Sequence, residues 1–305
     1  MWPIRDHQTG PFLEPARVWI RRQLNRLPPG LAEFVLFGLK QAWSCLFGAL
    51  VLFLIIATKL VWNQDWVINR YDALFLAALA IQITFLRLKM ESWEEAKVIL
   101  IYHVTGTCME IFKVRMGSWV YPEDAVFQIA GVPLFSGFMY ASVGSYMARA
   151  IRIFDMRFTH YPHFALTALL AAAIYINFYS HHYVTDLRLG LFAATLLLFG
   201  RVRIYFTVEQ KARWMQLVLA AFLTSIFLWI AENIGTATGI WLYPGQTELA
   251  HGVAAETGLL VSAALCQLCF GDNRLQAAAT RIAMTKSAIT PRLQHEHNLM
   301  YLFRK

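Results

Sequence analysis

The sequence predicts an all-α, polytopic membrane protein of about eight transmembrane helices, arranged as two parallel four-helix repeats. Three observations predict this class. The 305-residue chain is 58% hydrophobic and only 15% charged, whereas soluble domains are roughly 45–50% apolar and about 25% charged. Basic residues are concentrated in alternate segments between the apolar runs. One glutamate-containing motif also occurs twice, 122 residues apart.

The apolar runs give the expected positions of the helices. A run of about 18 or more apolar residues is long enough to span a bilayer. We expect one spanning helix in each of eight runs, of which the sixth is short and has Asp186 and Arg188 at its start. The runs are residues 38–62, 71–88, 98–118, 127–148, 164–181, 186–200, 214–235 and 252–270.

The basic residues set the expected orientation. Of the 27 lysines and arginines, 21 lie in the N-terminal tail, the second, fourth and sixth loops, and the C-terminal tail. The other loops contain only Arg70 and Arg188. Because basic segments remain on the cytoplasmic side, both termini are predicted to be cytoplasmic. This distribution accounts for the net charge of +8, so we expect a lipid bilayer and no nucleic acid as partner.

These spans divide the chain into four predicted parts. Residues 1–30 form a basic cytoplasmic tail, where Trp19 among arginines suits an interfacial helix. Residues 31–150 form the first four-helix repeat, and residues 151–271 form the second. Residues 272–305 form another basic cytoplasmic tail.

The repeated motif places a carboxylate deep in each half. "EIFKVRMGSWVYP" (residues 110–122) and "ENIGTATGIWLYP" (residues 232–244) both read Glu, six residues, Gly-x-Trp-x-Tyr-Pro. Gly, Trp, Tyr and Pro suit a helix end at the outer interface. Each glutamate precedes its Trp by nine residues, which is ~13 Å of helix and near the middle of a ~30 Å core. Such carboxylates face the bundle interior or a polar cavity.

The two glutamates are expected to differ in protonation. Lys113 follows Glu110 by one helical turn, so we expect Glu110 to be ionised. Gly235 takes the equivalent place after Glu232, which we expect to be protonated at neutral pH. An acid and a base in one site allow acid–base catalysis. We therefore predict Glu110, Glu232 and Lys113 as catalytic residues. The predicted substrate-binding residues are Trp119, Tyr121, Tyr140, Trp241 and Tyr243.

Small residues form a stripe along the fourth run. Gly137, Ala141, Gly144 and Ala148 recur at helical spacing. Small side chains let helix backbones approach closely. The stripe therefore predicts a tight helix–helix contact.

The histidines do not predict a metal centre. His160 and His163 fall on the opposite side of the predicted membrane from His181 and His182, so the two groups cannot share one metal. A small outer site of His181, His182, Asp186 and His251 remains open, although histidines in interfacial loops are the commoner case. Because the chain also lacks a glycine-rich phosphate loop and a His-Glu-x-x-His motif, we expect no metal and no cofactor.

Two resemblances extend this interpretation. The run "TGTCMEIFKVRMGSWVYPEDAVFQIAGVPLFSGFMYASVGSYMARA" resembles the bacterial membrane family catalogued as domain of unknown function 817, over most of the chain. That resemblance implies a multi-pass protein of the bacterial inner membrane and brings no activity with it. The motif followed by Gly-Val-Pro is similar to carotenoid hydratases and heterodimer-type lycopene cyclases. This second resemblance implies hydration or cyclisation of an isoprenoid.

On that second resemblance, each predicted residue has a role. Glu232 would protonate a buried C=C bond, and the aromatic faces would stabilise the resulting carbocation. Glu110 would take back a proton or activate water. Lys113 departs from this scheme, because a cation near a carbocation disfavours the chemistry.

Two other functions stay open at the level of sequence. Parallel repeats with paired midplane carboxylates also describe a proton-coupled transporter of a small solute. The third alternative is a non-catalytic membrane protein that binds lipid. A closed aromatic pocket would favour the enzyme, and a water-lined path would favour transport.

Overall fold

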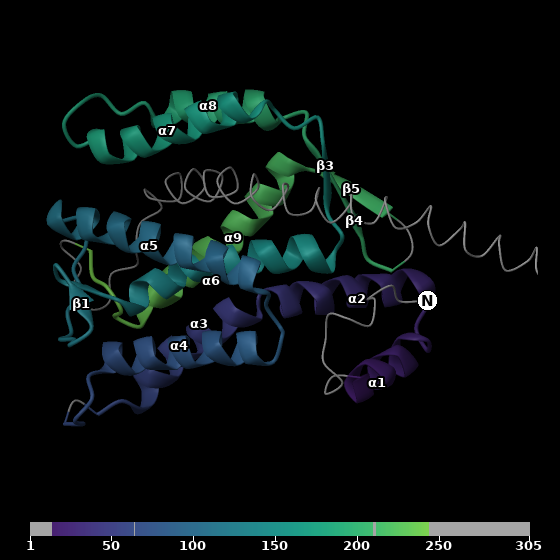
Figure 1. Ribbon diagram of the computed structural model, residues 1–305, viewed down its shortest axis with the longest axis horizontal. Helices are drawn as coiled ribbons and strands as arrows, with labels where there is room; N and C mark the ends of the chain where they lie inside the picture. Colours follow the sequence, from purple (N-terminus) through teal and green to yellow (C-terminus); the bar gives the residue numbers. More distant parts are fainter. Residues whose placement is uncertain (1–13, 64, 210–211, 244–305) are drawn as a thin grey trace, which may run out of the picture.

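The computed structural model describes residues 14–63, 65–209 and 212–243, and this part of the chain is mostly helical (Figure 1). The helices in chain order are α1 Glu14–Leu24, α2 Pro29–Ser44, α3 Leu46–Val61, α4 Arg70–Arg87, α5 Trp93–Arg115, α6 Phe135–Ile153, α7 Phe164–Ser180, α8 Arg188–Phe199 and α9 Leu217–Ala237. The strands are β1 Gln128–Ile129, β2 Val132–Pro133, β3 Arg157–Thr159, β4 Arg203–Thr207 and β5 Ala212–Gln216.

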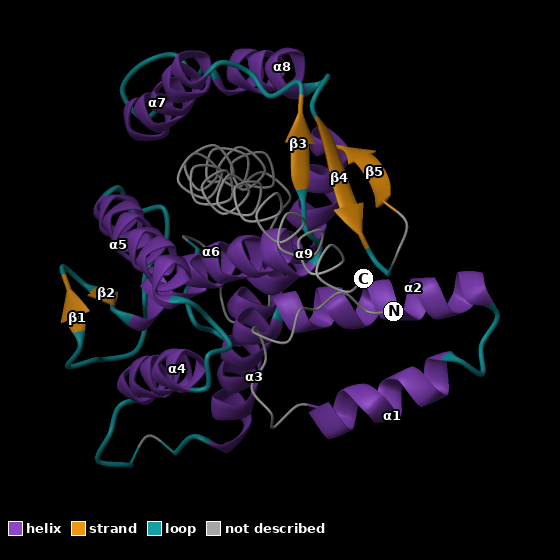
Figure 2. Cartoon of the chain, turned by 45° about the vertical axis from the view of Figure 1, so that its right-hand side comes forward, coloured by secondary structure: helices purple, strands orange, loops and turns teal. Residues whose placement is uncertain are grey.

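Helix α6 is the centre of the main helical group, because it packs against α2, α3, α4 and α5. The largest buried cluster joins side chains from α3, α4, α5 and α6 with the segment after α9, including Phe47, Tyr71, Phe138 and Trp241. Helices α7 and α8 pack on each other as a separate pair (Figure 2), over a second cluster that includes Leu170 and Phe199.

The contact between α5 and α6 is especially close. A Cβ atom built on Gly106 of α5 would lie 2.3 Å from the Tyr140 ring. A Cβ atom built on Gly137 of α6 would lie 2.5 Å from Thr107 Oγ1. The stripe of small residues therefore forms a close helix contact, as the sequence predicted.

The first predicted span, 38–62, is not one helix. Helices α2 and α3 meet at Cys45 with a bend of 66°. Just before the bend, the buried Ser44 hydroxyl donates to the carbonyl of Lys40 at 2.9 Å. The run of apolar residues did not reveal this break.

The prediction of an all-α chain was wrong in two places, where segments between helices form small sheets. In the first, β3, β4 and β5 form an antiparallel sheet in that order. Ile204 and Phe206 of β4 are buried while Arg203 is exposed, so the strand has the two-residue period of a half-buried strand. From the sequence alone, Arg203 and Arg213 indicate only the cytoplasmic side of the predicted membrane.

The sheet is attached to the main helical group. The backbone N–H of Thr207 in β4 donates to Phe154 O at 2.8 Å, just after α6. The Lys40 ammonium of α2 donates to Ile153 O at 3.3 Å and to Thr207 O at 3.1 Å. Helix α2, the end of α6 and strand β4 are therefore bonded together.

The second departure is a hairpin inside the predicted span 127–148. Strands β1 and β2 pair across Ala130 and Gly131, whose φ angles are 52° and 79°. Two consecutive positive φ angles are typical of two-residue hairpin turns. Helix α6 therefore begins only at Phe135. Hairpin and sheet lie toward opposite ends of α6 (Figure 1).

Within the described residues, one helix is long and apolar enough to cross a membrane. This is α9, with 21 residues, and the bent pair α2–α3 would add a second if counted as one span. Helices α7 and α8 are apolar but have only 17 and 12 residues. Helices α4 and α5 are long enough, but both carry several charged residues. Eight spans are therefore not shown, and the predicted run 252–270 lies outside the described residues.

Candidate functional site

The two copies of the motif meet in space. Val120 and Leu242 occupy the same position, between Trp and Tyr, in the two copies. Their backbones exchange two hydrogen bonds, 3.0 Å from Val120 N to Leu242 O and 2.9 Å in return. Gly117 and Gly239 end their helices with matching φ angles of 67° and 68°. Equivalent residues that bond reciprocally indicate a local two-fold axis between the motifs.

Glu110 is the most completely coordinated member of the site. It is only 4% exposed. Its Oε2 atom accepts hydrogen bonds from Trp119 Nε1 and from the Tyr121 hydroxyl, both at 2.8 Å. Its Oε1 atom accepts one from the Tyr140 hydroxyl at 2.7 Å. Three donors around one group suit an ionised carboxylate, which only accepts hydrogen bonds. Three of the five predicted substrate-binding residues thus hold Glu110 in place.

Lys113 is joined to Glu110 through one indole ring. The Lys113 side chain is buried, at 3% exposure, and its Nζ lies 5.7 Å from the Trp119 ring centroid. Trp119 therefore gives its N–H to Glu110 and a π face to Lys113. Phe178 of α7 provides a second ring, 4.8 Å from Nζ, and no pattern in the sequence predicts this contact.

Glu232 repeats part of this arrangement. It is half-buried on α9 and accepts a hydrogen bond from the Tyr243 hydroxyl at 3.1 Å, as Glu110 does from Tyr121. The Tyr243 ring meets the Trp119 ring edge to face at 6.1 Å. Glu232 and Tyr243 also interact electrostatically with the Tyr140 hydroxyl. The contact between Trp119 and Tyr243 therefore joins the surroundings of the two glutamates.

Trp241 belongs to the packing of the second motif. It is 8% exposed and lies in the main buried cluster. A Cβ atom on Gly235 would lie 2.2 Å from its indole ring. Gly235, which stands where the first motif has Lys113, thus provides the space that this ring fills.

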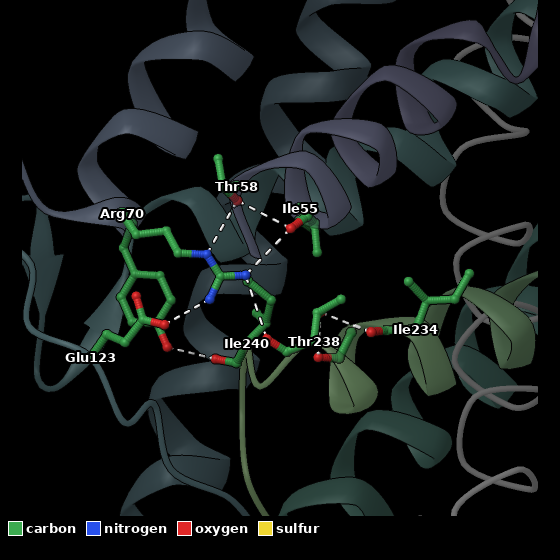
Figure 3. A network of polar contacts seen from close by, with 9 residues as sticks. Ile55, Thr58, Arg70, Glu123, Ile234, Thr238 and Ile240 are labelled. Atoms are coloured by element: carbon green, nitrogen blue, oxygen red, sulfur yellow. Dashed lines mark hydrogen bonds and ion pairs between the residues drawn. The ribbon is translucent and has the colours of Figure 1, made fainter. Parts of the chain in front are cut away.

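Sequence reasoning missed three consecutive residues at the start of α4, which we call the α4 clamp: Arg70, Tyr71 and Asp72. Arg70 is 4% exposed, and Figure 3 shows its guanidinium at the centre of a polar network. It pairs with Glu123 at 2.7 Å and donates to the carbonyl of Thr238 at 3.5 Å. It also donates to Thr58 Oγ1 at 3.2 Å and to the carbonyl of Ile55 at 3.3 Å.

The other two residues of the α4 clamp make further hydrogen bonds to the backbone. Tyr71 donates its hydroxyl to the carbonyl of Ile240 at 2.8 Å. Asp72 accepts from the backbone N–H groups of Val126 and Phe127, with shortest distances of 2.9 and 2.8 Å. The α4 clamp therefore fixes the second motif and the loop after the first. The presence of Arg70 in a predicted loop otherwise poor in cations was the available signal.

The outer histidines do not form a metal centre in the described part of the chain, where no three His, Cys, Asp or Glu residues are grouped for one. Nδ1 of His181 is 2.9 Å from the carbonyl of Phe178. Asp186 pairs with Arg188 at 3.1 Å. Desolvation, together with His181 and Lys113, lowers the pKa of His182. His251 lies outside the described residues.

Fold and site together define a class: a mostly helical protein, apolar on much of its exterior, with a buried acidic site built from two copies of one motif. The chain belongs to the family described as "Protein of unknown function (DUF817)", whose model matches residues 33–264.

Two similar proteins were found by comparison. The chain is 39% identical over 218 residues to "Uncharacterized protein YoaT" of Bacillus subtilis (strain 168), covering 72% of this chain and 82% of that protein. A crystal structure of a cross-linked MvINS trimer aligns with a TM-score of 0.39 and 17% identity, covering 59% of this chain and 96% of that one. The likeness to carotenoid hydratases and lycopene cyclases is not shown by these comparisons.

Proposed function

We propose that this chain is a multi-pass protein of the bacterial inner membrane that carries out acid–base chemistry on an apolar, lipid-borne ligand such as an isoprenoid. Glu110 and Glu232 form the paired site, and eight spans in two four-helix repeats form the scaffold. The observation that carries the proposal is that Trp119, which binds Glu110, and Tyr243, which binds Glu232, have their rings in contact at 6.1 Å.

Apolar side chains on the exterior support a membrane location. Large exposed residues occur on α3, α7, α8 and α9, among them Leu60 at 79%, Leu169 at 68%, Leu197 at 84% and Phe227 at 72%. Apolar patches of this extent are rare on soluble monomers and mark lipid or protein contacts. Arg152, after the fourth predicted span, also binds Glu95, before the third, at 2.7 Å. This pair joins two segments that the basic residues assign to the cytoplasmic side.

The local two-fold axis between the motifs supports the repeat. Two parallel repeats in a membrane are related by an axis along the membrane normal. Such an axis makes equivalent residues meet, as Val120 and Leu242 do. In the proposed scaffold, Glu110 and Glu232 lie at equal depth on the two sides of this axis.

The surroundings of the two glutamates suit different roles. The donors from Trp119, Tyr121 and Tyr140 stabilise Glu110 as a carboxylate, which suits the base. We assign the role of the acid to Glu232, which accepts a hydrogen bond from the Tyr243 hydroxyl at 3.1 Å. Two carboxyl groups whose environments differ can act as acid and base in one reaction.

In the proposed step, Glu232 gives its proton to one carbon of a C=C bond and becomes a carboxylate. The cation forms on the adjacent carbon beside the rings of Trp119 and Tyr243, whose π faces attract it. Glu110 then takes a proton from a neighbouring carbon, or from water that adds to the cation. Lys113 Nζ lies 5.7 Å from the centroid of the Trp119 ring, so its positive charge competes with the proposed carbocation for this ring.

The test compares the membrane lipids of cells that produce wild type, Glu110→Gln or Glu232→Gln, by mass spectrometry. We expect a lipid pair, differing by isomerisation or by the mass of water, whose ratio changes in both variants. Tyr183→Phe, outside the site, serves as the control. Identical lipid profiles in all four strains would refute the proposal, and proton flux in liposomes without lipid conversion would establish transport instead.

A further inference from the structure

A second group of polar atoms lies in the α5–α6 contact, toward the start of α5 from Glu110. His103, Thr107 and Glu110 follow one another at spacings of four and three residues, so they share one face of α5. At 1.5 Å per residue, His103 is ~10 Å along the helix from Glu110. This face meets α6, where Tyr140 binds Glu110.

Gly137 of α6 provides the space for this group. A Cβ atom at this position would lie 2.7 Å from His103 Nδ1 and 2.5 Å from Thr107 Oγ1. Both polar atoms therefore lie against the α6 backbone, beside the fully buried Ser136. Tyr140 follows Gly137 by three residues on the same helix.

Two of these atoms have unused hydrogen-bonding capacity. Nδ1 of His103 and Oγ of Ser136 are buried and have no hydrogen-bond partner among the described residues. Thr107 Oγ1 donates to His103 O at 2.8 Å and keeps its own lone pairs. The His103 ring packs against Phe138, with the ring centroids 4.6 Å apart. This contact provides no hydrogen-bond partner for Nδ1. Because nearly all buried polar atoms are paired, this group favours a role in moving protons.

We propose that His103 exchanges protons with Glu110 through the hydroxyl groups of Tyr140 and Thr107. The inference rests on the proposed function, in which Glu110 takes a proton from the ligand and has to release it. Protonated Glu110 gives its proton to the Tyr140 oxygen, and the Tyr140 hydroxyl proton passes to the Thr107 oxygen. The Thr107 hydroxyl proton then passes to His103 Nδ1, which lies with Thr107 Oγ1 around the Cβ position of Gly137. The products are Glu110 carboxylate, neutral tyrosine and His103 imidazolium. Imidazole suits this role because it both binds and releases protons near neutral pH.

The test is a pH-jump experiment on the full-length protein in liposomes, followed by time-resolved infrared spectroscopy. The carboxylic acid band of Glu110 is assigned by its loss in Glu110→Gln. In His103→Gln, deprotonation of Glu110 is expected to slow about 100-fold, the size of a general acid–base contribution. Gly137→Ala is expected to slow it as well, because the new methyl group displaces His103 and Thr107. His160→Gln, at a loop, is the matched control.

The outcomes separate this inference from the proposed function. An unchanged rate in both His103→Gln and Gly137→Ala would overturn the proton path, whatever the lipid profiles show. Absence of a Glu110 carboxylic acid band at every pH would overturn it too. If Glu110→Gln and Glu232→Gln leave lipids unchanged while His103→Gln slows proton release, the lipid chemistry fails and the path stands.

Discussion

Val120 and Leu242, 122 residues apart, hold each other by two reciprocal backbone hydrogen bonds. Each lies between the Trp and the Tyr of its motif, so the pairing sets where four aromatic side chains lie. Trp119 meets Tyr243 across the pair at 6.1 Å. The position of the paired glutamates thus depends on a contact between two backbones.

Leu242→Pro tests this contact, because proline has no N–H to donate to Val120. Losing one backbone hydrogen bond costs about 0.5–1.5 kcal/mol, so we expect the melting temperature to fall by roughly 1–6 °C. Leu242→Ala keeps both bonds and is the control for the lost side chain. Thermal unfolding in detergent, followed by tryptophan fluorescence, measures the difference. Equal melting temperatures for the two variants would contradict the pairing.

Carbodiimide labelling tests the difference in protonation. Hydrophobic carbodiimides modify protonated carboxyl groups in apolar surroundings, so we expect Glu232 to be labelled and Glu110 to be spared. Removing two donors in Tyr121→Phe/Tyr140→Phe is expected to make Glu110 reactive, since an ionised carboxylate with fewer donors takes up a proton more easily. Peptide mass spectrometry locates the label. Preferential labelling of Glu110 in the wild type would reverse the assignment of acid and base.

Gly106→Ala tests the close approach of α5 and α6. The new methyl group would lie 2.3 Å from the Tyr140 ring, so we expect a loss of about 1–3 kcal/mol by overpacking. Gly38→Ala, in α2, is the control, because nothing lies within 4 Å of that Cβ position. There we expect a gain of about 0.5–1 kcal/mol. Denaturant unfolding measures both, and equal effects would show that the helices are not in close contact.

Arg70→Met tests the α4 clamp. Its partner Glu123 is 31% exposed while Arg70 is buried, so the variant loses an ion pair and leaves several carbonyl groups unpaired. We expect a cost of about 3–5 kcal/mol. Arg188→Met, which breaks a more exposed pair with Asp186, is expected to cost no more than about 1 kcal/mol. A cost for Arg70→Met as small as that of Arg188→Met would mean that the clamp does not stabilise the motifs.

Sequence patterns identified the motif glutamates and two helices well, because their signals are local. The runs 71–88 and 164–181 match α4 and α7 within a residue or two. Glu110 and Tyr140 contact each other, and both were predicted site residues. The stripe at Gly137 also marked its helix contact, since spacing along one helix is enough to predict a packing face.

Other features depended on contacts between distant segments. The bend of 66° between α2 and α3 falls inside one predicted span, and a count of apolar residues cannot detect it. The role of Tyr140 as a donor to Glu110, rather than a wall for substrate, depends on how α5 and α6 dock. Arg70 donates to the carbonyl of Thr238, 168 residues away along the chain. No local sequence pattern predicts this hydrogen bond, apart from the presence of an isolated cation. The two-residue period of apolar residues in β4 is present in the sequence. It was not recognised, because Arg203 was interpreted only as a residue of the cytoplasmic side.

The attachments at the two ends of the helical group limit how it can move. At one end Val120 is bonded to Leu242, and at the other Lys40 and Phe154 are bonded to Thr207. A transporter that rocks one half of its fold against the other would have to break one set of these bonds in every cycle. Rotation of side chains and lateral separation of neighbouring helices break neither set of hydrogen bonds. Entry of a ligand from the lipid is therefore compatible with an otherwise rigid helical group.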